Sequence, residues 1–590
     1  MLPVVMQERF VIVGALVIFT TAVIGGAAQA NSPVADAVMK GDRAALVKLL
    51  QQKADVNAPQ VDGATALHWA VHHEDLDAAD RLLRAGAKVD VTNREGAAPL
   101  AMASQHGNAA MIELLIKAGA DPKQRGPNGE TMLMYAARNG NPAAIRTLLA
   151  AGIDVNAKER LRNTTALMWA AEQRHPEVVK LLLAAKADYS AKSGPAGLPR
   201  NYFAAKVNVE NVDLNRRRRA AAAAAGRTYQ EQLEWEQTQG LTVVERRGVV
   251  NVPPPTPDDD DPVIVAGLVG TGGGGLTALV FAAREGDLDS ARALLDAGAD
   301  VNQQTEYGWT PLLTAVNNRN YQLAKLLVER GADVNIANKG GWTPVYLATD
   351  NRNIEGGDYP VPRPDMDHLE LIELLLQRGA NPNARVRENT LTRTIFTMQW
   401  FFEAGATAFV RASQSSDTGL MKLLLKYGAD PKIATDLGDT ALTACAGIGW
   451  VEGVTYERSK EENVEAIRML LDLGLDPNHA NNEGRTPLMG AALKGRSDVV
   501  RLLVERGARL ETRDRGSRDT EDAGSIAAGA RFQALDYSEG LVRAGVQSAI
   551  ARPDTSQLIR QLMIERGLQV PPPNRDINSI CVVAICAPQP

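Results

Sequence analysis

Residues 310–342 read TPLLTAVNNRNYQLAKLLVERGADVNIANKGGW, and TPVYLA from Thr343 begins the same pattern again. The hydroxyl of the first threonine can accept a hydrogen bond from an otherwise unpaired backbone N–H, and proline is tolerated in the first turn of a helix. A helix is therefore expected to begin after Thr310. The run YQLAKLLVER predicts a second helix, which Gly331 is expected to end in a left-handed conformation.

Two motifs of this stretch recur along the chain. The first is TALHWA from Thr65, AAPLAMA from Ala97, TMLMYAA from Thr131, TALMWAA from Thr165, TALVFAA from Thr277, TPLLTA from Thr310, TPVYLA from Thr343, TAFVRA from Thr407, TALTAC from Thr440 and TPLMGAA from Thr486. The second is ADVN after Lys53, GAKVD from Gly86, GADP from Gly119, GIDVN from Gly152, GADVN from Gly298 and Gly331, GANPN from Gly379, GADP from Gly428 and GLDPN from Gly474.

The spacing of the first motif shows how the units combine. Its helix-starting positions fall at 65, 98, 131 and 165 and again at 277, 310 and 343, so the undisturbed period is 33 or 34 residues. Alanine pairs such as Ala136-Ala137 let two helices approach closely, and the leucines of the second helix face the neighbouring unit. Since one such unit cannot bury its own apolar face, a stack of units is predicted.

This period and these motifs resemble the ankyrin-repeat family from about Ala35 to about Gly567, and the chain is identified as a member of an exported, bacterial type. The resemblance implies an all-α repeat solenoid. Its stacked helix-turn-helix units would have short hairpin loops and would number about ten to twelve, interrupted by insertions. Because terminal units must be atypical, we interpret Ala35–Asn57 as an N-terminal cap.

Interruptions of the period divide the chain. The step from Thr165 to Thr277 contains no further copy of the motif, but it contains runs of arginine, proline, aspartate and glycine that resist a packed core. Shorter insertions are expected around Ile354–His368, Arg385–Phe402 and Val451–Glu461. We expect a signal peptide at 1–30, N-terminal repeats at 31–188, a low-complexity, largely disordered insertion at 189–275, central and C-terminal repeats at 276–511, a degenerate C-terminal cap at 512–567 and a flexible tail at 568–590.

The N-terminus has the pattern of a secretory signal. Arg9 precedes an apolar run from Phe10 to Ile24, and small residues ending in Ala28-Gln29-Ala30 follow. An uncleaved anchor is the alternative, but the run is nearer to about 15 residues than to the roughly 20 that a membrane span needs. We therefore expect cleavage after Ala30, export to the periplasm or the medium, and no stable membrane insertion of the mature chain.

The composition and the number of cysteines limit the classes of protein to which the chain can belong. The chain of 590 residues is 45% hydrophobic and 23% charged with a net charge of −6, which argues against wholesale disorder and against a nucleic-acid partner. Three cysteines are too few for a disulfide framework. Cys581 and Cys586 are a possible local disulfide in an oxidising compartment, whereas Cys445 is expected to be a buried free thiol.

Three patterns suggest chemistry, but each has a simpler explanation. Gly270–Gly275 matches a dinucleotide-binding glycine pattern, but the helix after it continues the repeat. His68 and His72 are four residues apart on a helix, yet no third metal ligand is evident, and His68 is interpreted as hydrogen-bonding the neighbouring loop. The basic run Arg216–Arg219 is interpreted as solvated. We assign no catalytic residue, metal or cofactor.

The family pattern implies where a partner would bind. Hairpin tips and first helices line a concave groove, and the residue before the capping threonine varies: here it is Ala64, Ala97, Glu130, Thr164, Trp309, Trp342, Ala406, Asp439 and Arg485. The groove candidates are Tyr307, Trp309, Asn317, Asn318, Trp342, Asp350 and Asn351. In the alternative interpretation, Trp309 and Trp342 pack on each other or under the Ile354–His368 insertion. The aromatic residues Trp69, Tyr135, Trp169 and Phe281 are assigned to packing.

From the sequence we predict an exported, monomeric, non-enzymatic scaffold that binds a protein, as an accessory or inhibitor of a co-secreted enzyme. Two alternatives remain open. One is an enzyme whose site lies in the long insertion, and the other is an effector that acts inside another cell. Partner identity does not follow from the fold, since this architecture accommodates many partners.

Overall fold

The computed structural model describes residues 32–194, 274–353, 363–387, 403–450, 456–515, 531–542 and 550–573, together with the single residues 225, 227 and 235. Within these ranges the chain forms 24 helices and no strand. The only extended pairing there is an isolated bridge between Arg513 and Gln533. The helices follow the expected repeat, so the predicted all-α repeat solenoid is confirmed.

The chain divides into two compact units, residues 1–127 and residues 128–590. In the first unit, consecutive first helices pack on each other, and each also packs on the second helix of its own repeat. The helices of this unit are α1 (Pro33–Met39), α2 (Arg43–Gln51), α3 (Ala66–His72), α4 (Leu76–Arg84), α5 (Pro99–His106) and α6 (Ala109–Lys117).

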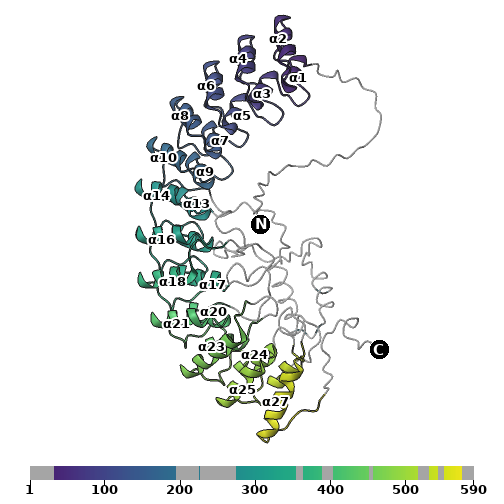
Figure 1. Ribbon diagram of the computed structural model, residues 1–590, viewed down its shortest axis with the longest axis vertical. Coiled ribbons are helices and arrows are strands. Elements are labelled where there is room, and N and C mark those ends of the chain that lie inside the picture. The colour runs from purple at the N-terminus through teal and green to yellow at the C-terminus, as the bar shows by residue number, and fades with distance from the viewer. Residues whose placement is uncertain are drawn as a thin grey trace, which may run out of the picture. The chain divides into compact units, whose positions relative to one another are not determined.

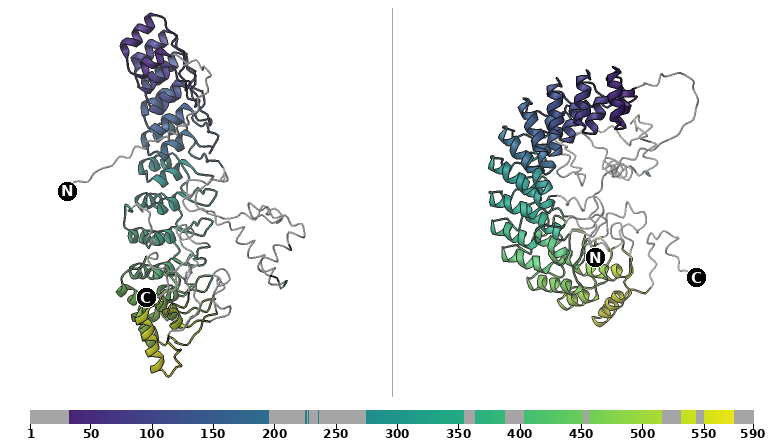
Figure 2. Two further views of the ribbon diagram at one scale, coloured as in Figure 1. Left: turned by 90° about the vertical axis from the view of Figure 1, so that its right-hand side faces the viewer. Right: turned by 45° about the horizontal axis from the view of Figure 1, so that its top comes forward.

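The second unit repeats the same arrangement over a longer stretch. First helices form one layer and second helices the other, and each layer is stacked in chain order (Figure 1; Figure 2). The helices are α7 (Met132–Asn139), α8 (Pro142–Ala150), α9 (Ala166–Glu172), α10 (Pro176–Ala184), α13 (Ala278–Glu285), α14 (Leu288–Asp296), α15 (Pro311–Asn317), α16 (Tyr321–Glu329), α17 (Pro344–Arg352), α18 (His368–Gln377), α20 (Ala408–Gln414), α21 (Thr418–Lys426), α22 (Ala441–Ala446), α23 (Lys460–Asp472), α24 (Pro487–Lys494), α25 (Ser497–Glu505), α26 (Ala534–Ser538) and α27 (Pro553–Glu565).

Side-chain caps explain where the helices begin and end. The Thr310 hydroxyl accepts a hydrogen bond of 3.1 Å from the Leu313 N–H, and Thr131 does the same for Met134 at 3.1 Å. Gly331 ends the α16 helix with a φ of +90°, the left-handed conformation that the GADVN motif predicts. The expected helix boundaries are thereby confirmed for these repeats.

The last residue of that motif ties each loop to the next repeat. The Asn335 side chain donates to the Gly379 carbonyl at 2.9 Å and accepts from the Asn381 N–H at 2.7 Å. The same pair of bonds joins Asn57 to Gly86 and Lys88, Asn156 to Lys186 and Asp188, Asn383 to Gly428 and Asp430, and Asn478 to Gly507 and Arg509. These asparagines fix the register of neighbouring repeats.

The long insertion leaves the repeat at a hairpin tip. The Ser193 N–H donates to the Leu276 carbonyl at 2.9 Å, and the Gly275 N–H donates to the Ser193 carbonyl at 3.1 Å. Residues 189–194 and 274–275, expected within the insertion, therefore complete a hairpin of the stack. Residues 195–224 and 236–273 lie outside the described residues, as do the expected signal peptide and residues 574–590 of the expected tail.

Other interruptions fall at two kinds of place. Residues 388–402 and 516–530 interrupt hairpin loops. In these loops the Ala406 carbonyl accepts a hydrogen bond from the Val386 N–H, and the Phe532 carbonyl accepts one from the Asp514 N–H. Residues 354–362, 451–455 and 543–549 separate the two helices of a pair. Residues 516–530 and 543–549 of the expected degenerate cap lie outside the described residues, and its helices α26 and α27 pack on α24 and α25.

Candidate functional site

The two tryptophans expected to anchor a partner are buried. Trp309 is 5% exposed and Trp342 is 1% exposed, and their rings meet edge to face with centroids 5.9 Å apart. Gly340 leaves room for this arrangement, because a Cβ there would lie 2.9 Å from the Trp342 indole. The exposure expected of these rings is therefore wrong, and the alternative, in which they pack on each other, describes the structure.

Most of the neighbouring polar candidates are also engaged within the chain. The Asn318 side chain donates to the Thr314 carbonyl at 2.8 Å, and the Asn351 side chain donates to the Val316 carbonyl at 2.7 Å. Asp350 is buried against Arg411. Asn317 is half-buried, and Tyr307 is 39% exposed with the Lys339 ammonium 5.7 Å from its ring centre. Of the seven candidates, Tyr307 therefore offers the most accessible surface.

A buried ionic cluster fills the face of the repeats that follow. Arg411 is 1% exposed and donates to Asp350 at 2.7 Å and to the Ser415 hydroxyl at 3.0 Å. The fully buried Glu403 carboxylate lies 3.8 Å from Arg411 and accepts a hydrogen bond from the Tyr346 hydroxyl at 3.0 Å. These buried charges are paired with one another, so they do not form a surface for a partner.

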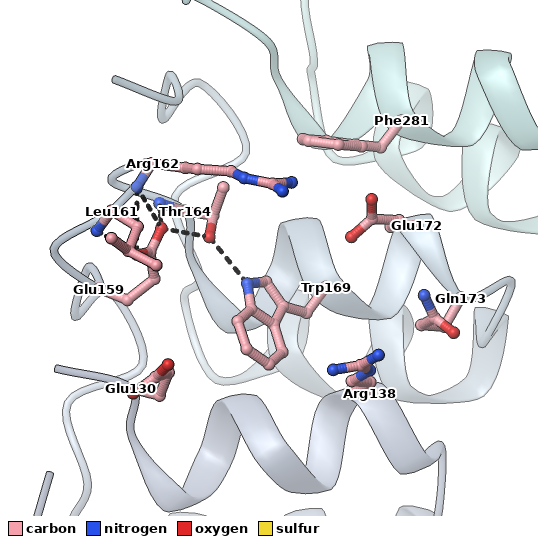
Figure 3. A pocket seen from close by; sticks show the side chains of 10 residues that line it. All are labelled: Glu130, Arg138, Glu159, Leu161, Arg162, Thr164, Trp169, Glu172, Gln173 and Phe281. Carbon is pink, nitrogen blue, oxygen red and sulfur yellow. Dashed lines mark hydrogen bonds between the residues drawn. The ribbon is translucent and has the colours of Figure 1, made fainter. Parts of the chain in front are cut away.

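A pocket of about 360 Å³ opens in the earlier repeats of the same unit. It lies among α7, α9 and α13 and the hairpin that precedes α9 (Figure 3). Its lining residues are Glu130, Arg138, Glu159, Leu161, Arg162, Thr164, Trp169, Glu172, Gln173 and Phe281. Glu130 and Thr164 occupy the position before the capping threonine that the family pattern identifies as variable.

One carboxylate organises the hairpin at the pocket. Glu159 is 4% exposed and accepts from the backbone N–H groups of Arg162 at 2.9 Å and Thr164 at 2.8 Å. The Thr164 hydroxyl donates to the same carboxylate at 2.7 Å and accepts from the Trp169 indole N–H at 2.7 Å (Figure 3). This chain of hydrogen bonds holds the Trp169 ring against the pocket wall.

Two further carboxylates are satisfied by the chain itself. Burial alone would raise the pKa of Glu130, but hydrogen bonds from Asn128 and from the Tyr135 hydroxyl outweigh it and lower that pKa. Burial and the nearby Glu130 raise the pKa of Tyr135 to about 12. Glu172 is paired with Arg284 at 2.8 Å, and the Arg284 guanidinium lies 5.0 Å from the Phe281 ring centre.

Two arginines complete the pocket. Arg138 and Arg162 are exposed, and Figure 3 shows their guanidinium groups on either side of Trp169. Within the described residues, neither guanidinium has a hydrogen-bond or ion-pair partner. The pocket therefore offers unused hydrogen-bond donors beside an indole, while its acids are already occupied. This arrangement suits recognition of an acceptor group.

The aromatic lining was missed because of its place in the repeat. The lining residues Trp169 and Phe281, like Tyr135 beside Trp169, stand four residues after the capping threonine, a position that we assigned to packing. Phe281 is buried, but Tyr135 and Trp169 are half-buried, with ring centroids 6.3 Å apart. The recurrence of aromatic residues at this one position was the signal available in the sequence.

The remaining sequence candidates have simple outcomes. His68 is 2% exposed, its Nδ1 lies 2.9 Å from the Thr65 hydroxyl, and its Nε2 lies 3.1 Å from the Ala97 carbonyl of the neighbouring hairpin, which confirms its structural role. Cys445 is a buried free thiol, as expected, and burial raises its pKa to about 12. Cys581, Cys586 and Arg216–Arg219 lie outside the described residues, as does most of Gly270–Gly275.

The described ranges contain no group of three or more His, Cys, Asp or Glu side chains placed to hold a metal ion. In the same ranges, no helix has the length and apolar character needed to cross a membrane.

Comparison with known proteins identifies the repeat. A family model described as ankyrin repeats (3 copies) matches residues 34–126, 111–193, 279–386 and 409–514, more than half of the chain. The chain is similar to ankyrin repeat and SOCS box protein 16 of Homo sapiens, 32% identical over 161 residues, which are 24% of this chain and 34% of that protein. It is also similar to ankyrin repeat, SAM and basic leucine zipper domain-containing protein 1 of Dasypus novemcinctus, 32% identical over 107 residues, which are 18% of this chain and 21% of that protein. A third relative, serine/threonine-protein kinase 12 of Arabidopsis thaliana, is 41% identical over 66 residues, which are 11% of this chain and 14% of that protein. The chain thus spans about a third of the length of these relatives or less.

Proposed function

Because the chain belongs to the ankyrin-repeat family, we propose that it is a scaffold that binds a protein partner at the pocket of α7, α9 and α13. One observation carries this proposal. The pocket combines a half-buried indole, Trp169, with two guanidinium groups that have no partner in the described part of the chain. Aromatic and arginine side chains in one pocket are the usual anchors of protein interfaces.

The lining residues favour binding over catalysis. The Thr164 hydroxyl is held between Glu159 and Trp169, and all three carboxylates of the pocket already accept hydrogen bonds or ion pairs from the chain. A catalytic site needs a nucleophile and an acid or base that are free to react. We therefore propose a non-enzymatic role, as an accessory or inhibitor of a co-secreted enzyme.

We further propose that the chain is exported to the periplasm or beyond. This rests on the apolar run Phe10–Ile24 and the small residues up to Ala30. N-terminal sequencing of the chain from its producing cells should find Asn31 as the first residue. A membrane-bound chain that retains Met1 would contradict export through a cleaved signal.

Site-specific photo-crosslinking tests the binding proposal. A photoreactive phenylalanine derivative replaces Leu161, which is 58% exposed at the rim of the pocket. The matched control replaces Val61, which is 65% exposed at the tip of another hairpin. We expect a discrete protein adduct from position 161 and none from position 61. Equal labelling from both positions, or no adduct from position 161, would contradict the proposed site.

A further inference from the structure

The pocket of α7, α9 and α13 has satisfied acceptors. Asn128 supplies Glu130 with hydrogen bonds from its backbone and side-chain nitrogens, both at 2.9 Å. Glu159 holds the hairpin, and Glu172 is paired with Arg284. The charge of each carboxylate is therefore already partly compensated by hydrogen-bond donors of the chain.

The two guanidinium groups of the pocket, unlike its carboxylates, have no partner among the described residues. Arg138 and Arg162 each present a guanidinium, and neither group has an acceptor among the described residues. A guanidinium donates two parallel hydrogen bonds to a carboxylate, and such charge-assisted bonds are about twice as strong as neutral ones. An anionic group of a bound partner could therefore supply the acceptor that these two guanidinium groups lack among the described residues.

The remaining lining is apolar. Leu161 stands 58% exposed at the rim, and the half-buried Trp169 ring lies between the two guanidinium groups (Figure 3). At about 360 Å³, the pocket has room for a side chain or two rather than for a folded element. An occupant would thus combine a charged acceptor with a neighbouring apolar side chain.

We propose that this pocket receives an aspartate or glutamate side chain, next to a large apolar residue, from an extended segment of the protein partner. The inference rests on the proposed function and gives the chemistry of the partner. The carboxylate would accept hydrogen bonds from the Arg138 or the Arg162 guanidinium, beside the Trp169 ring, and the apolar residue would contact Trp169 and Leu161. Burial against the indole strengthens the charged hydrogen bonds, since the local dielectric is lower than that of water.

A polyanion fits the same pocket poorly. Nucleic acids carry closely spaced charges, and their binding is driven by many phosphate contacts. Glu130, Glu159 and Glu172 surround the two arginines and would repel phosphates beyond the first. The net charge of −6 for the whole chain acts in the same direction. A single carboxylate meets this repulsion with one charge only, and it can accept two parallel hydrogen bonds from one guanidinium.

Selection from a random peptide library on the full chain tests the proposal. A library of twelve-residue peptides displayed on phage is selected in parallel on the unaltered chain and on the double variant Arg138→Gln with Arg162→Gln. The control double variant, Arg146→Gln with Arg501→Gln, removes the same charge from exposed positions on α8 and α25. We expect the unaltered chain and the control to enrich peptides in which Asp or Glu adjoins a large apolar residue.

A synthetic copy of the most enriched peptide then gives the magnitude. Its affinity should fall by about tenfold or more in the Arg138/Arg162 variant and should stay unchanged in the control, with both variants melting like the unaltered chain. Selected peptides without acids, equal affinity for both variants, or no selected peptide would overturn the proposal. Tighter binding of single-stranded DNA than of the peptide would overturn it in favour of a polyanion.

Crosslinking at position 161 separates this inference from the proposed function. A protein adduct that persists unchanged in the Arg138/Arg162 variant contradicts the acidic recognition but leaves the scaffold role standing. The absence of any adduct in the unaltered chain contradicts both. Loss of the adduct in the Arg138/Arg162 variant, but not in the Arg146/Arg501 control, supports both.

Discussion

The indole ring of Trp309 meets that of Trp342 edge to face, with centroids 5.9 Å apart and an angle of 67° between the ring planes. The two residues precede the capping threonines of adjacent repeats, so their contact joins α15 to α17. Edge-to-face pairs add stability beyond the area that they bury. This pair therefore belongs to the contact between repeats rather than to a surface for a partner.

Replacing Trp342 by alanine should therefore destabilise the stack. Truncation of a buried tryptophan costs about 3–5 kcal/mol, and in a repeat protein the loss is felt mainly by neighbouring repeats. Hydrogen exchange should accelerate in α15 and α17, and thermal unfolding should begin earlier. The control Tyr307→Ala, at a residue 39% exposed, should change stability by only about 0.5 kcal/mol. Unchanged exchange in Trp342→Ala would show that the pair is not structural.

The architecture was predictable because each repeat contains its own sequence signals for where its helices begin and end. Caps such as Thr310 and stops such as Gly331 depend on residues within one unit, and the period repeats that information many times. The site was less predictable. The same repeat position holds Trp169 in the open pocket and Arg411 in the buried cluster, half-buried in one and 1% exposed in the other. Exposure at that position depends on what covers it, and Arg411 is covered in part by Asp350, which is 61 residues away in the chain.

The Arg411 cluster provides a second prediction. Arg411→Met removes the positive charge that lies 2.7 Å from Asp350 and 3.8 Å from Glu403, both of which are buried carboxylates. Breaking one side of a buried ion pair costs about 3–5 kcal/mol. Urea unfolding of the single variants and of Arg411→Met combined with Asp350→Asn should show that the combined loss is smaller than the sum. Strict additivity would mean that the two residues do not interact.

The inter-repeat asparagines provide a third. Asn383→Ala removes the bond of its side chain to the Gly428 carbonyl and the bond that it accepts from Asp430. Each hydrogen bond contributes about 0.5–1.5 kcal/mol, so a loss of roughly 1–3 kcal/mol is expected. Asn156→Ala breaks the equivalent bonds to Lys186 and Asp188 and should cost a similar amount in urea unfolding. A negligible cost at both sites would show that these bonds do not set the register.

The protonation of His368 is expected to make the stability of the fold depend on pH. Its ring meets the Tyr321 ring edge to face with centroids 5.3 Å apart, and its buried Nε2 has no hydrogen-bond partner in the described residues. Burial, together with the charges of Arg319 and Arg352, lowers the pKa of His368 to about 4 from an ordinary 6.5. The native imidazole therefore stays neutral at pH values where the unfolded one is already protonated.

That difference makes the stability of the α18 region depend on pH in a definite direction. Between about pH 6.5 and pH 4 the unfolded state binds more protons than the native state at His368, so the free energy of unfolding falls as the solution is acidified. His368→Phe retains an aromatic ring against Tyr321 but cannot titrate. We expect its free energy of unfolding in urea to fall less between about pH 7.5 and about pH 4.5 than that of the unaltered chain. If the free energy of unfolding fell equally in both proteins, groups other than His368 would be responsible for the pH dependence.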